Sequence, residues 1–247
     1  MGKLEGRVAV ITGGGRNIGR AISKLFASEG AKIVIFDMDS DRASEVAEEI
    51  AESGGEGHPI VGQVNKVADV QRMIEGAVGH FGQIDILVNC AAISDRNPML
   101  DLDDEDYHRI IDVTMNGTYY CCRYVSQQMV RQGKGGAIVN FSSGSAFVGN
   151  LRRVAYDMAK GAIVTLTMDM AVQLASHNIR TNCIAPGITG SQVGGQISFE
   201  DRSTTNLVGG RAGHPEEQAD LALFLASDDS RHLWGQTFRN DGGSSIL

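Results

Sequence analysis

The sequence predicts an α/β protein with a single domain over residues 1–247, built on a doubly wound, mostly parallel seven-stranded sheet with helices on both faces. Seven short segments rich in Val and Ile alternate with longer segments whose apolar residues recur with the period of a helix. The strand segments read as continuous apolar runs, which is typical of parallel strands covered on both sides. Neither a linker nor a low-complexity tract interrupts this alternation.

The individual elements follow from local patterns. The strands are predicted at 7–12, 32–37, 58–64, 84–90, 136–143, 179–186 and 235–241. A first helix is predicted at 17–28, where Ile18, Ile22 and Phe26 mark one face, and Gly30 stands at a plausible C′ position after it. A second helix over about 41–52 is closed by the glycine-rich segment 54–57.

Composition excludes several classes of partner. The net charge of -8 and the acidic balance argue against binding to nucleic acid or to an anionic membrane surface. No run approaches the ~18 apolar residues of a membrane span, and the first strand begins too early for a secretory signal, so we expect a cytoplasmic protein. The four cysteines lack metal-ligand spacing and are expected to be reduced thiols, and we expect no metal site.

The stretch "VAVITGGGRNIGRAI", Val8 to Ile22, runs from an apolar strand through a glycine cluster into a helix. Such a turn lets the backbone approach a pyrophosphate, which then faces the free N–H groups of the helix. Glycines also make ordinary tight turns, but Asp37 ends the second strand 18 residues after Gly19, near the position of an acid that binds the adenosine ribose. A carboxylate there favours NAD over NADP, although Arg16 and Arg42 could reach a phosphate.

A second set of residues indicates chemistry. Tyr156 and Lys160 are four residues apart in "YDMAK" and would share one face of a helix. A free tyrosine is a poor base near neutral pH, but a neighbouring ammonium and an oxidised nicotinamide favour its phenolate. Ser143 lies 13 residues before Tyr156 at the end of a strand, where its hydroxyl could hold the oxygen of an alcohol or a carbonyl.

With these residues, the sequence resembles the short-chain dehydrogenase/reductase family over essentially its whole length. The marks are "TGGGRNIG" at 12–19, Asp37, "NCAA" at 89–92, Ser143, "YDMAK" at 156–160, "PGITGS" at 186–191 and "DGG" at 241–243. The resemblance implies a Rossmann-type fold, chemistry on alcohols and carbonyls with NAD(P), and a homotetramer or homodimer formed through helices around 100–130 and 156–176.

The resemblance also implies roles for single residues. Tyr156 would be the general acid/base, Ser143 would orient the substrate oxygen, and Lys160 would bind the nicotinamide ribose and favour the tyrosine phenolate. Asn89 would support the adenosine side, and 188–191 would meet the nicotinamide carboxamide. The full predicted cofactor set is Gly13, Arg16, Asn17, Ile18, Gly19, Asp37, Gln63, Val64, Asn89, Ala91, Tyr156, Lys160, Pro186, Gly187, Thr189 and Ser191.

Four departures from the family pattern matter. Asn17 replaces the second glycine of Thr-Gly-x-x-x-Gly-x-Gly, where glycine serves either a positive φ or room beside the cofactor. Gln63 stands where an aspartate often contacts adenine. In the Asn-Asn-Ala-Gly element, Cys90 replaces the second asparagine and Ala92 replaces the glycine. Alignment on Gly117 places Thr114 at the fourth catalytic position, which in the family is an asparagine that holds a water in a proton relay; Asn116 would point elsewhere unless the helix is bulged.

The substrate is expected over the nicotinamide, bordered by the segment after "NCAA", by 144–153 and by a long polar loop at about 188–212. The candidate substrate residues are Ser94, Arg96, Ser145 and Arg153. Arg152, Arg153 and Arg202 could clamp a carboxylate, phosphate or sulfonate, but as solvated surface arginines they need have no such role.

Two hypotheses about function follow. The first is an NAD-dependent dehydrogenase/reductase that interconverts a secondary alcohol and a ketone on a small molecule, such as a sugar, a hydroxy acid or another anionic alcohol. The second, motivated by Thr114 and Asn17, is a nucleotide-binding or scaffold protein that keeps the fold with weakened catalysis. The joint presence of Ser143, Tyr156 and Lys160 favours the first.

Overall fold

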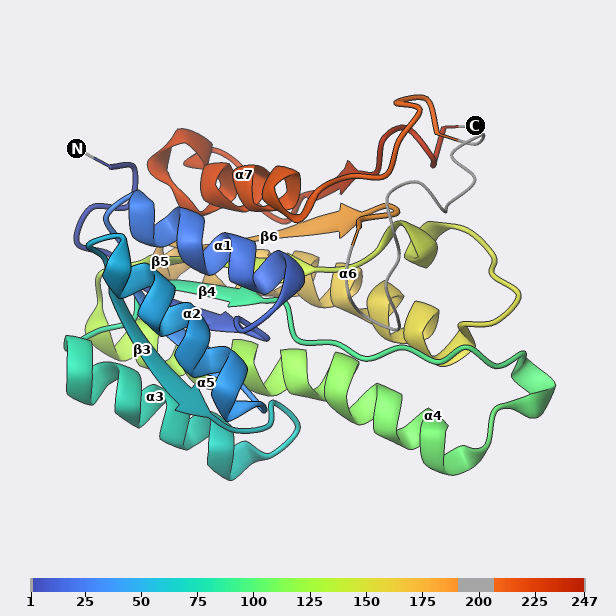
Figure 1. The fold of residues 1–247 in the computed structure, drawn as a ribbon, viewed down its shortest axis with the longest axis horizontal. Helices are drawn as coiled ribbons and strands as arrows, with labels where there is room; N and C mark the ends of the chain where they lie inside the picture. The colour runs from blue at the N-terminus through green and yellow to red at the C-terminus, as the bar shows by residue number, and fades with distance from the viewer. Residues whose placement is uncertain (1, 191–206, 247) are drawn as a thin grey trace.

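The structure is a computed structural model that describes residues 2–190 and 207–246. Its centre is a seven-stranded sheet in which every described pair of neighbouring strands is parallel, in the order β3-β2-β1-β4-β5-β6-β7 (Figure 1). The strands are β1 Val8–Thr12, β2 Lys32–Asp37, β3 Glu56–Val61, β4 Ile86–Asn89, β5 Gly136–Phe141, β6 Ile179–Pro186 and β7 Thr237–Asn240. The predicted doubly wound architecture is confirmed, and the sheet is parallel throughout rather than mostly so.

The helices form a layer on each face of the sheet. They are α1 Asn17–Ser28, α2 Ser40–Glu52, α3 Val67–Phe81, α4 Asp104–Ile110, α5 Gly117–Gln132, α6 Val154–Leu174 and α7 Pro215–Ala226. A π-helical segment, η2 Ile111–Asn116, joins α4 to α5, and short 3-10 turns lie at η1 Met99–Asp101, η3 Gly144–Phe147, η4 Ala175–His177 and η5 Asp228–Ser230.

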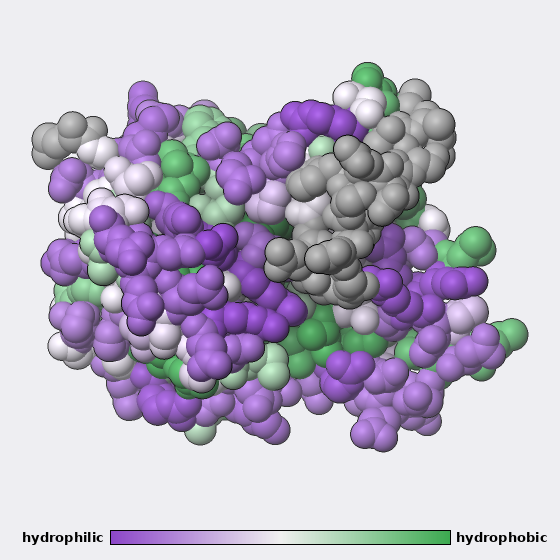
Figure 2. Space-filling model, in the orientation of Figure 1, coloured by the Kyte–Doolittle hydropathy of each residue, from purple (hydrophilic) through white to green (hydrophobic). Residues whose placement is uncertain are grey.

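Side chains of a strand point alternately to the two faces, and the strands therefore supply two separate cores. In β1, Ala9 and Ile11 join the cluster beneath α1, α2 and α7, while Val10 joins the cluster beneath α3, α5 and α6. All five β1 residues are buried, which explains why this strand reads as one apolar run in the sequence. The sheet is thus fixed from both sides, and the outer surface in this view is predominantly hydrophilic (Figure 2).

The parallel arrangement brings the carboxyl ends of all the strands to one edge of the sheet, the edge from which the loops after β1, β2, β4, β5 and β6 leave. The register is specific there, since Thr12 pairs with Asn89 and Asn89 pairs with Asn140. Ligand sites in open α/β sheets lie outside these carboxyl ends, where the strand order reverses. Here that reversal falls between β1 and β4.

Most of the predicted substrate loop, 188–212, lies outside the described residues. The two ends of the loop are described, and they are joined to each other by a parallel bridge between Thr189 and Gly213. The Gly213 N–H donates to the Ile188 carbonyl at 2.8 Å, and the Gly190 N–H donates to the Gly213 carbonyl at 2.9 Å. Arg211 pairs with Glu217, and together with the His214 N–H it holds the pKa of Glu217 at about 2. The two ends of the loop are therefore held together by hydrogen bonds beside the end of β6.

A buried arginine fastens β6 to the C-terminal end of α7. Arg180 is 7% exposed, and its guanidinium donates to the carbonyls of Leu225, Ser227 and Ser230 and to the Ser230 hydroxyl. These carbonyls lie at and just beyond the end of α7, and the bonds from Arg180 add to those that they accept from Ser230 and Leu233. Arg180 thus joins β6 to the segment at the end of α7 through hydrogen bonds from a buried guanidinium.

We expect Arg180→Ala to lower the free energy of unfolding by about 3 kcal/mol, because it removes several charged hydrogen bonds from a buried contact. Urea unfolding followed by circular dichroism measures this loss. The matched control is Arg231→Ala, since Arg231 is exposed and bonds only the nearby Asp228 carbonyl among the contacts described. Equal effects of the two substitutions would contradict the assignment.

Candidate active site

The turn between β1 and α1 is built for close approach of a ligand to the backbone. Gly13 has φ +63, and a Cβ at Gly19 would lie 2.1 Å from the Gly13 carbonyl oxygen, so only glycine fits there. A Cβ on Gly13 would lie 3.0 Å from the Cα of Ala91, which follows β4. The helix α1 begins directly after this turn, and its first N–H groups face the same space.

Asn17 is the first residue of α1 and has φ 48. It is one of two described non-glycine residues with positive φ, the other being Asn178. Asparagine tolerates this left-handed conformation better than most side chains. Of the two reasons for a glycine at this position, the structure shows that the positive φ applies, and asparagine supplies it.

Asp37 ends β2 beside the glycine turn. Its carboxylate is 7% exposed and accepts hydrogen bonds from the N–H of Gly15 at 3.0 Å and of Asp39 at 3.2 Å. Asp39 in turn pairs with Arg42 at 3.2 Å. The carboxylate of Asp37 is therefore held in place by the backbone on both sides, at the position where a ribose would meet it.

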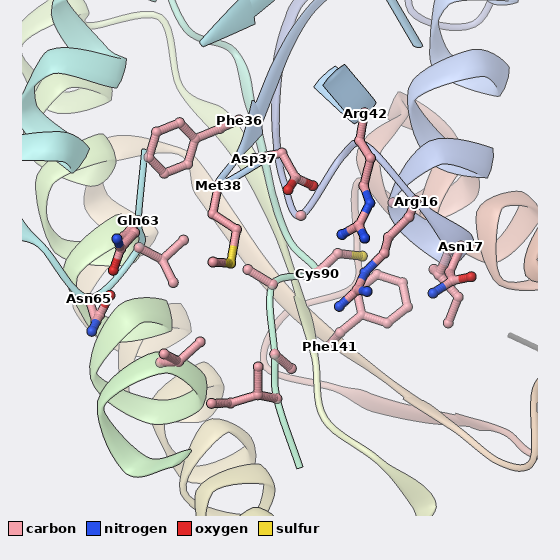
Figure 3. Close-up of a pocket in the computed structure, with 18 of the residues that line it drawn as sticks. Arg16, Asn17, Phe36, Asp37, Met38, Arg42, Gln63, Asn65, Cys90 and Phe141 are labelled. Atoms are coloured by element: carbon pink, nitrogen blue, oxygen red, sulfur yellow. The ribbon is translucent and has the colours of Figure 1, made fainter. Parts of the chain in front are cut away.

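A cavity of about 420 Å³ opens over the carboxyl ends of the strands (Figure 3). Eleven of the predicted cofactor residues line it: Gly13, Arg16, Asn17, Ile18, Gly19, Asp37, Gln63, Val64, Ala91, Lys160 and Pro186. The lining also includes residues that sequence reasoning missed as cofactor contacts, among them Met38, Asn65, Arg109 and Val113. Met38 directly follows Asp37 and is 69% exposed. Its flexible apolar side chain is suited to a flat heterocyclic ring.

Asn89, Tyr156, Gly187 and Thr189 are not among the residues that line this cavity, and Ser191 lies outside the described residues. Asn89 is 2% exposed, and its amide donates to Asn140 Oδ1 at 2.9 Å and contacts Cys122 Sγ at 3.2 Å. Its side chain ties β4 to β5. Its cofactor role therefore remains a prediction, as does that of the other three.

The cavity fits a dinucleotide on its own geometry. The glycine turn leaves space that a Cβ would fill, the N-terminus of α1 faces it, and a buried carboxylate stands at one side. Arg16 and Arg42 also line it, so cationic groups are present near Asp37 as well (Figure 3). Both an uncharged ribose edge and a phosphate would thus meet a partner in this cavity.

Lys160 and Tyr156 lie on the same face of α6, as predicted. Lys160 is 3% exposed, donates to the Phe141 carbonyl at 2.6 Å and lies 5.5 Å from the centroid of the Tyr156 ring. The Ser142 hydroxyl donates to the Lys160 carbonyl at 2.7 Å, which adds a second link between β5 and α6. The ammonium is thereby fixed next to the phenol and at the wall of the cavity.

Ser143 follows β5 and forms the N-cap of η3. Its Oγ accepts from the Ser145 N–H at 3.2 Å and lies 2.9 Å from Ser145 Oγ. Ser143 and Tyr156 are both half-buried. The hydroxyl and the phenol thus remain accessible, while the groups that support them are buried.

Thr114 occupies the fourth predicted catalytic position and is completely buried. Its Oγ1 donates to the Ile93 carbonyl at 2.9 Å and accepts from the Ile93 N–H at 3.1 Å, and its own carbonyl accepts from the Thr118 hydroxyl at 2.8 Å. The helix is bulged here, since η2 is π-helical, yet Asn116 bonds Asp112 at an exposed position. Thr114 rather than Asn116 therefore faces the loop after β4.

Asp95 is a supporting residue that sequence reasoning missed. It is 4% exposed, and its carboxylate accepts from the N–H of Ala155 and of Tyr156, both at 3.1 Å. It caps the N-terminus of α6 from a loop 60 residues earlier in the chain. No local pattern could have revealed this, because helix caps are usually supplied by the residue at the helix start.

The candidate substrate residues are placed unevenly. Ser94 and Arg96 are exposed on the loop after β4, Ser145 is buried beside Ser143, and the Arg153 guanidinium lies 6.0 Å from the Tyr156 ring. Arg202 lies outside the described residues. The structure therefore brings Ser145 and Arg153 to the catalytic residues, whereas the arginine clamp as a whole is not described.

The four cysteines are free thiols, as expected. Cys90 lines the cavity, and burial raises the pKa of its thiol to about 12 even though Lys160 opposes the shift. Burial also raises the pKa of Cys122 to about 12 and of Cys183 to about 11. None of these thiols is activated as a nucleophile.

Together, the parallel sheet and the site at its carboxyl edge define a nucleotide-binding α/β protein of the oxidoreductase class. Comparison with known proteins agrees: the family model described as enoyl-(acyl carrier protein) reductase matches residues 13–245. The chain belongs to the short-chain dehydrogenase/reductase family, whose members bind a nicotinamide cofactor and act on small molecules. It is an oxidoreductase of that family.

Similar proteins cover nearly the whole chain. A 3-oxoacyl-(acyl-carrier-protein) reductase, FabG, from Thermotoga maritima is 34% identical and covers 99% of this chain and 100% of its own. The 3beta-hydroxysteroid dehydrogenase 2 of Eggerthella lenta is 36% identical over 98% of this chain and 96% of its own. A crystal structure of a short-chain type dehydrogenase/reductase from Mycobacterium marinum has a TM-score of 0.93 at 34% identity and covers 99% of this chain and 97% of its own.

Among the described residues, no helix is long and apolar enough to cross a membrane. Within the same residues, no group of three or more His, Cys, Asp or Glu could hold a metal ion.

We predict that Asn17→Gly keeps the fold and changes the Kd for NAD by no more than about threefold, because glycine adopts the same positive φ freely. Asn17→Val is expected to strain the turn by about 1–2 kcal/mol and to weaken binding more. Calorimetric titration with NAD and thermal unfolding of both variants measure the two effects. A large loss of affinity in Asn17→Gly would show instead that the amide is itself a ligand.

Proposed function

We propose that the protein is an NAD-dependent oxidoreductase that interconverts a secondary alcohol and a ketone on a small molecule. The observation that carries this proposal is the fixed position of the Lys160 ammonium, 5.5 Å from the Tyr156 ring and at the cavity wall, with Ser143 at the end of the adjacent strand. A bound nicotinamide supplies the acceptor or donor of the hydride.

The residues of the chain would divide the remaining work. In the direction of oxidation, the Tyr156 phenolate takes the hydroxyl proton of the alcohol, and Ser143 holds the substrate oxygen in place. Lys160 is already anchored to Phe141 and would use its remaining N–H groups to hold the cofactor ribose and to stabilise the phenolate. In reduction the same groups act in reverse, with Tyr156 donating the proton.

Thr114 is proposed as the fourth member of this set, acting by position. Its hydroxyl holds both backbone groups of Ile93 and so fixes the loop after β4, which lines the cavity. This contact and the φ of Asn17 account for the two departures that motivated the scaffold hypothesis. Both departures are compatible with an intact site, which supports the catalytic proposal over the scaffold.

The proposal also covers the oligomeric state, the cellular location and the substrate class of the enzyme. We infer a homotetramer or homodimer, supported by exposed apolar side chains on α5 and α6, namely Tyr119, Met158, Met168 and Val172. We also infer a cytoplasmic enzyme, and substrates that include sugars, hydroxy acids and other anionic alcohols, with Arg153, 6.0 Å from the Tyr156 ring, and Arg96, on the loop after β4, as candidate cationic contacts. Size-exclusion chromatography with light scattering tests the assembly.

We expect Tyr156→Phe to lower kcat by about 10³-fold, because the general acid/base is lost, while the Kd for NAD stays within about twofold. NADH appearance at 340 nm across a panel of secondary alcohols, sugars and hydroxy acids measures turnover, and calorimetry measures binding. Tyr119→Phe is the control, since Tyr119 is 42% exposed on α5. Unchanged turnover in Tyr156→Phe would refute the mechanism, and a panel without activity despite NAD binding would favour the scaffold.

We expect Asp37→Asn to raise the preference for NADP over NAD, measured as the ratio of kcat/KM values, by about tenfold, which corresponds to ~1.4 kcal/mol. The substitution keeps an acceptor for the Gly15 N–H but removes the charge that repels a 2′-phosphate. Asp41→Asn is the matched control, because Asp41 is exposed in the first turn of α2. An unchanged ratio would show that Asp37 does not determine cofactor choice.

A further inference from the structure

A chain of buried polar side chains runs between the sheet and the helices α5 and α6. Asn89 Nδ2 donates to Asn140 Oδ1 at 2.9 Å, Cys122 Sγ lies 3.4 Å from the same oxygen, and Asn140 Nδ2 donates to Thr167 Oγ1 at 3.0 Å. The Thr167 hydroxyl donates in turn to the Ile163 carbonyl at 2.8 Å. All four polar side chains are buried, the most exposed being Asn89 at 2%. The chain therefore joins β4, α5, β5 and α6 inside the core.

The hydrogen bonds of this chain have one consistent direction. Thr167 has a single hydroxyl hydrogen, which goes to the Ile163 carbonyl, so its oxygen accepts from Asn140. Asn140 must then present its Nδ2 to Thr167 and its Oδ1 to Asn89. An inverted Asn140 amide would oppose two acceptors at one end and two donors at the other. The carbonyl of α6 thus fixes how the Asn140 side chain is turned.

The end of β5 holds α6 at two levels. The Phe141 carbonyl accepts from Lys160 Nζ at 2.6 Å, and the Ser142 hydroxyl donates to the Lys160 carbonyl at 2.7 Å. Asn140 reaches the same helix at Thr167, seven residues further on and on the same face, which is about 10 Å along the helix axis. A helix that is fixed at one level can pivot about it, and the contact at the second level prevents this movement.

Such a pivot would act on the proposed catalytic residues. Tyr156 lies one turn before Lys160, on the side opposite to Thr167, and its N–H donates to the buried Asp95 at 3.1 Å. When the contact at Thr167 is lost, the part of α6 that follows Lys160 is free to move away from β5. The ammonium and the phenol then shift relative to the cavity and to each other, and small displacements of this kind reduce catalysis.

We propose that Asn140, through Thr167, is a positioning residue that aligns the Lys160 ammonium with the Tyr156 phenol. This inference rests on the proposed function, because the aligned groups are those that would act in it. Neither Asn140 nor Thr167 is among the described residues that line the cavity, so the effect passes through α6. If the chain only satisfied buried polar groups, it would contribute to stability and would leave catalysis unchanged.

The first experiment changes the acceptor on α6 and follows kcat for oxidation against pH, using the panel alcohol with the highest turnover. Thr167→Val keeps the shape of the side chain and removes the acceptor of Asn140 Nδ2. We expect kcat to fall by about fivefold and the acid limb of the profile to move up by about 0.5 pH unit, because a displaced ammonium stabilises the phenolate less. Thr167→Ser retains the hydroxyl and should restore the wild-type profile.

Two controls separate positioning from stability. Thr165→Val makes the same substitution at an exposed position of the same helix and should leave the profile unchanged. Arg180→Ala lowers stability at the end of α7, and its profile should also coincide with that of the wild type. The proposal is overturned by a Thr167→Val profile that coincides with the wild type. A fall in kcat that is equal at every pH would overturn it as well, since a purely structural loss has this form.

The second experiment asks whether Asn140 acts through Thr167. Asn140→Ala should produce the same fall in kcat and the same movement of the acid limb as Thr167→Val. In the double variant the losses should be no larger than in either single variant, because both substitutions remove one shared interaction. Losses that multiply in the double variant would show that the two residues act independently, and the proposal would fail.

The inference and the proposed function fail in different ways. If the wild type oxidises no panel alcohol, the proposed function fails, and calorimetric titration with NAD then decides the inference. Because Lys160 would hold the cofactor ribose, Thr167→Val should weaken the Kd for NAD by about threefold, whereas Thr167→Ser should not. An unchanged Kd in Thr167→Val would show that the contact at Thr167 does not position Lys160.

Discussion

The contact between the Lys160 ammonium and the Phe141 carbonyl holds the site together. It joins α6 to the end of β5, and it does so with a buried charge whose other N–H groups face the cavity. A buried ammonium is tolerated only where acceptors surround it. The fold supplies one acceptor from the strand, and a bound ribose would supply others, so in the proposed mechanism the same side chain would serve both the cofactor and Tyr156.

The other supports of the catalytic helix come from distant parts of the chain. Asp95 caps the first N–H groups of α6 from the loop after β4, and Thr114 fixes that same loop from the π-helical segment. Through these two contacts, the loop that lines the cavity is hydrogen-bonded both to the helix that carries Tyr156 and Lys160 and to the π-helical segment. A displacement of either would move the phenol relative to the cofactor, and such displacements reduce catalysis strongly.

The departures from the family pattern can be understood in the same physical terms. Asparagine at position 17 is compatible with a turn that needs positive φ, and threonine at 114 is short enough to bond both backbone groups of Ile93. Asn89, which is expected beside the cofactor, is buried in the structure and joins two strands through Asn140. A matching motif identifies where a residue stands in the fold, whereas its contacts depend on the packing around it.

Several features were determined by the sequence alone: the seven strands, the glycine turn, the acidic residue after β2, and the spacing of Tyr156 and Lys160. They are local, since they depend on hydrophobic periodicity, on glycine conformations and on positions within one helix turn. The tertiary structure alone decided that Asp95 caps α6, that Met38 and Arg109 line the cavity, and that Arg180 bonds the end of α7. Each of these contacts joins elements that are remote in the chain or places a side chain by packing, and local patterns carry no information about which buried donor will meet which acceptor.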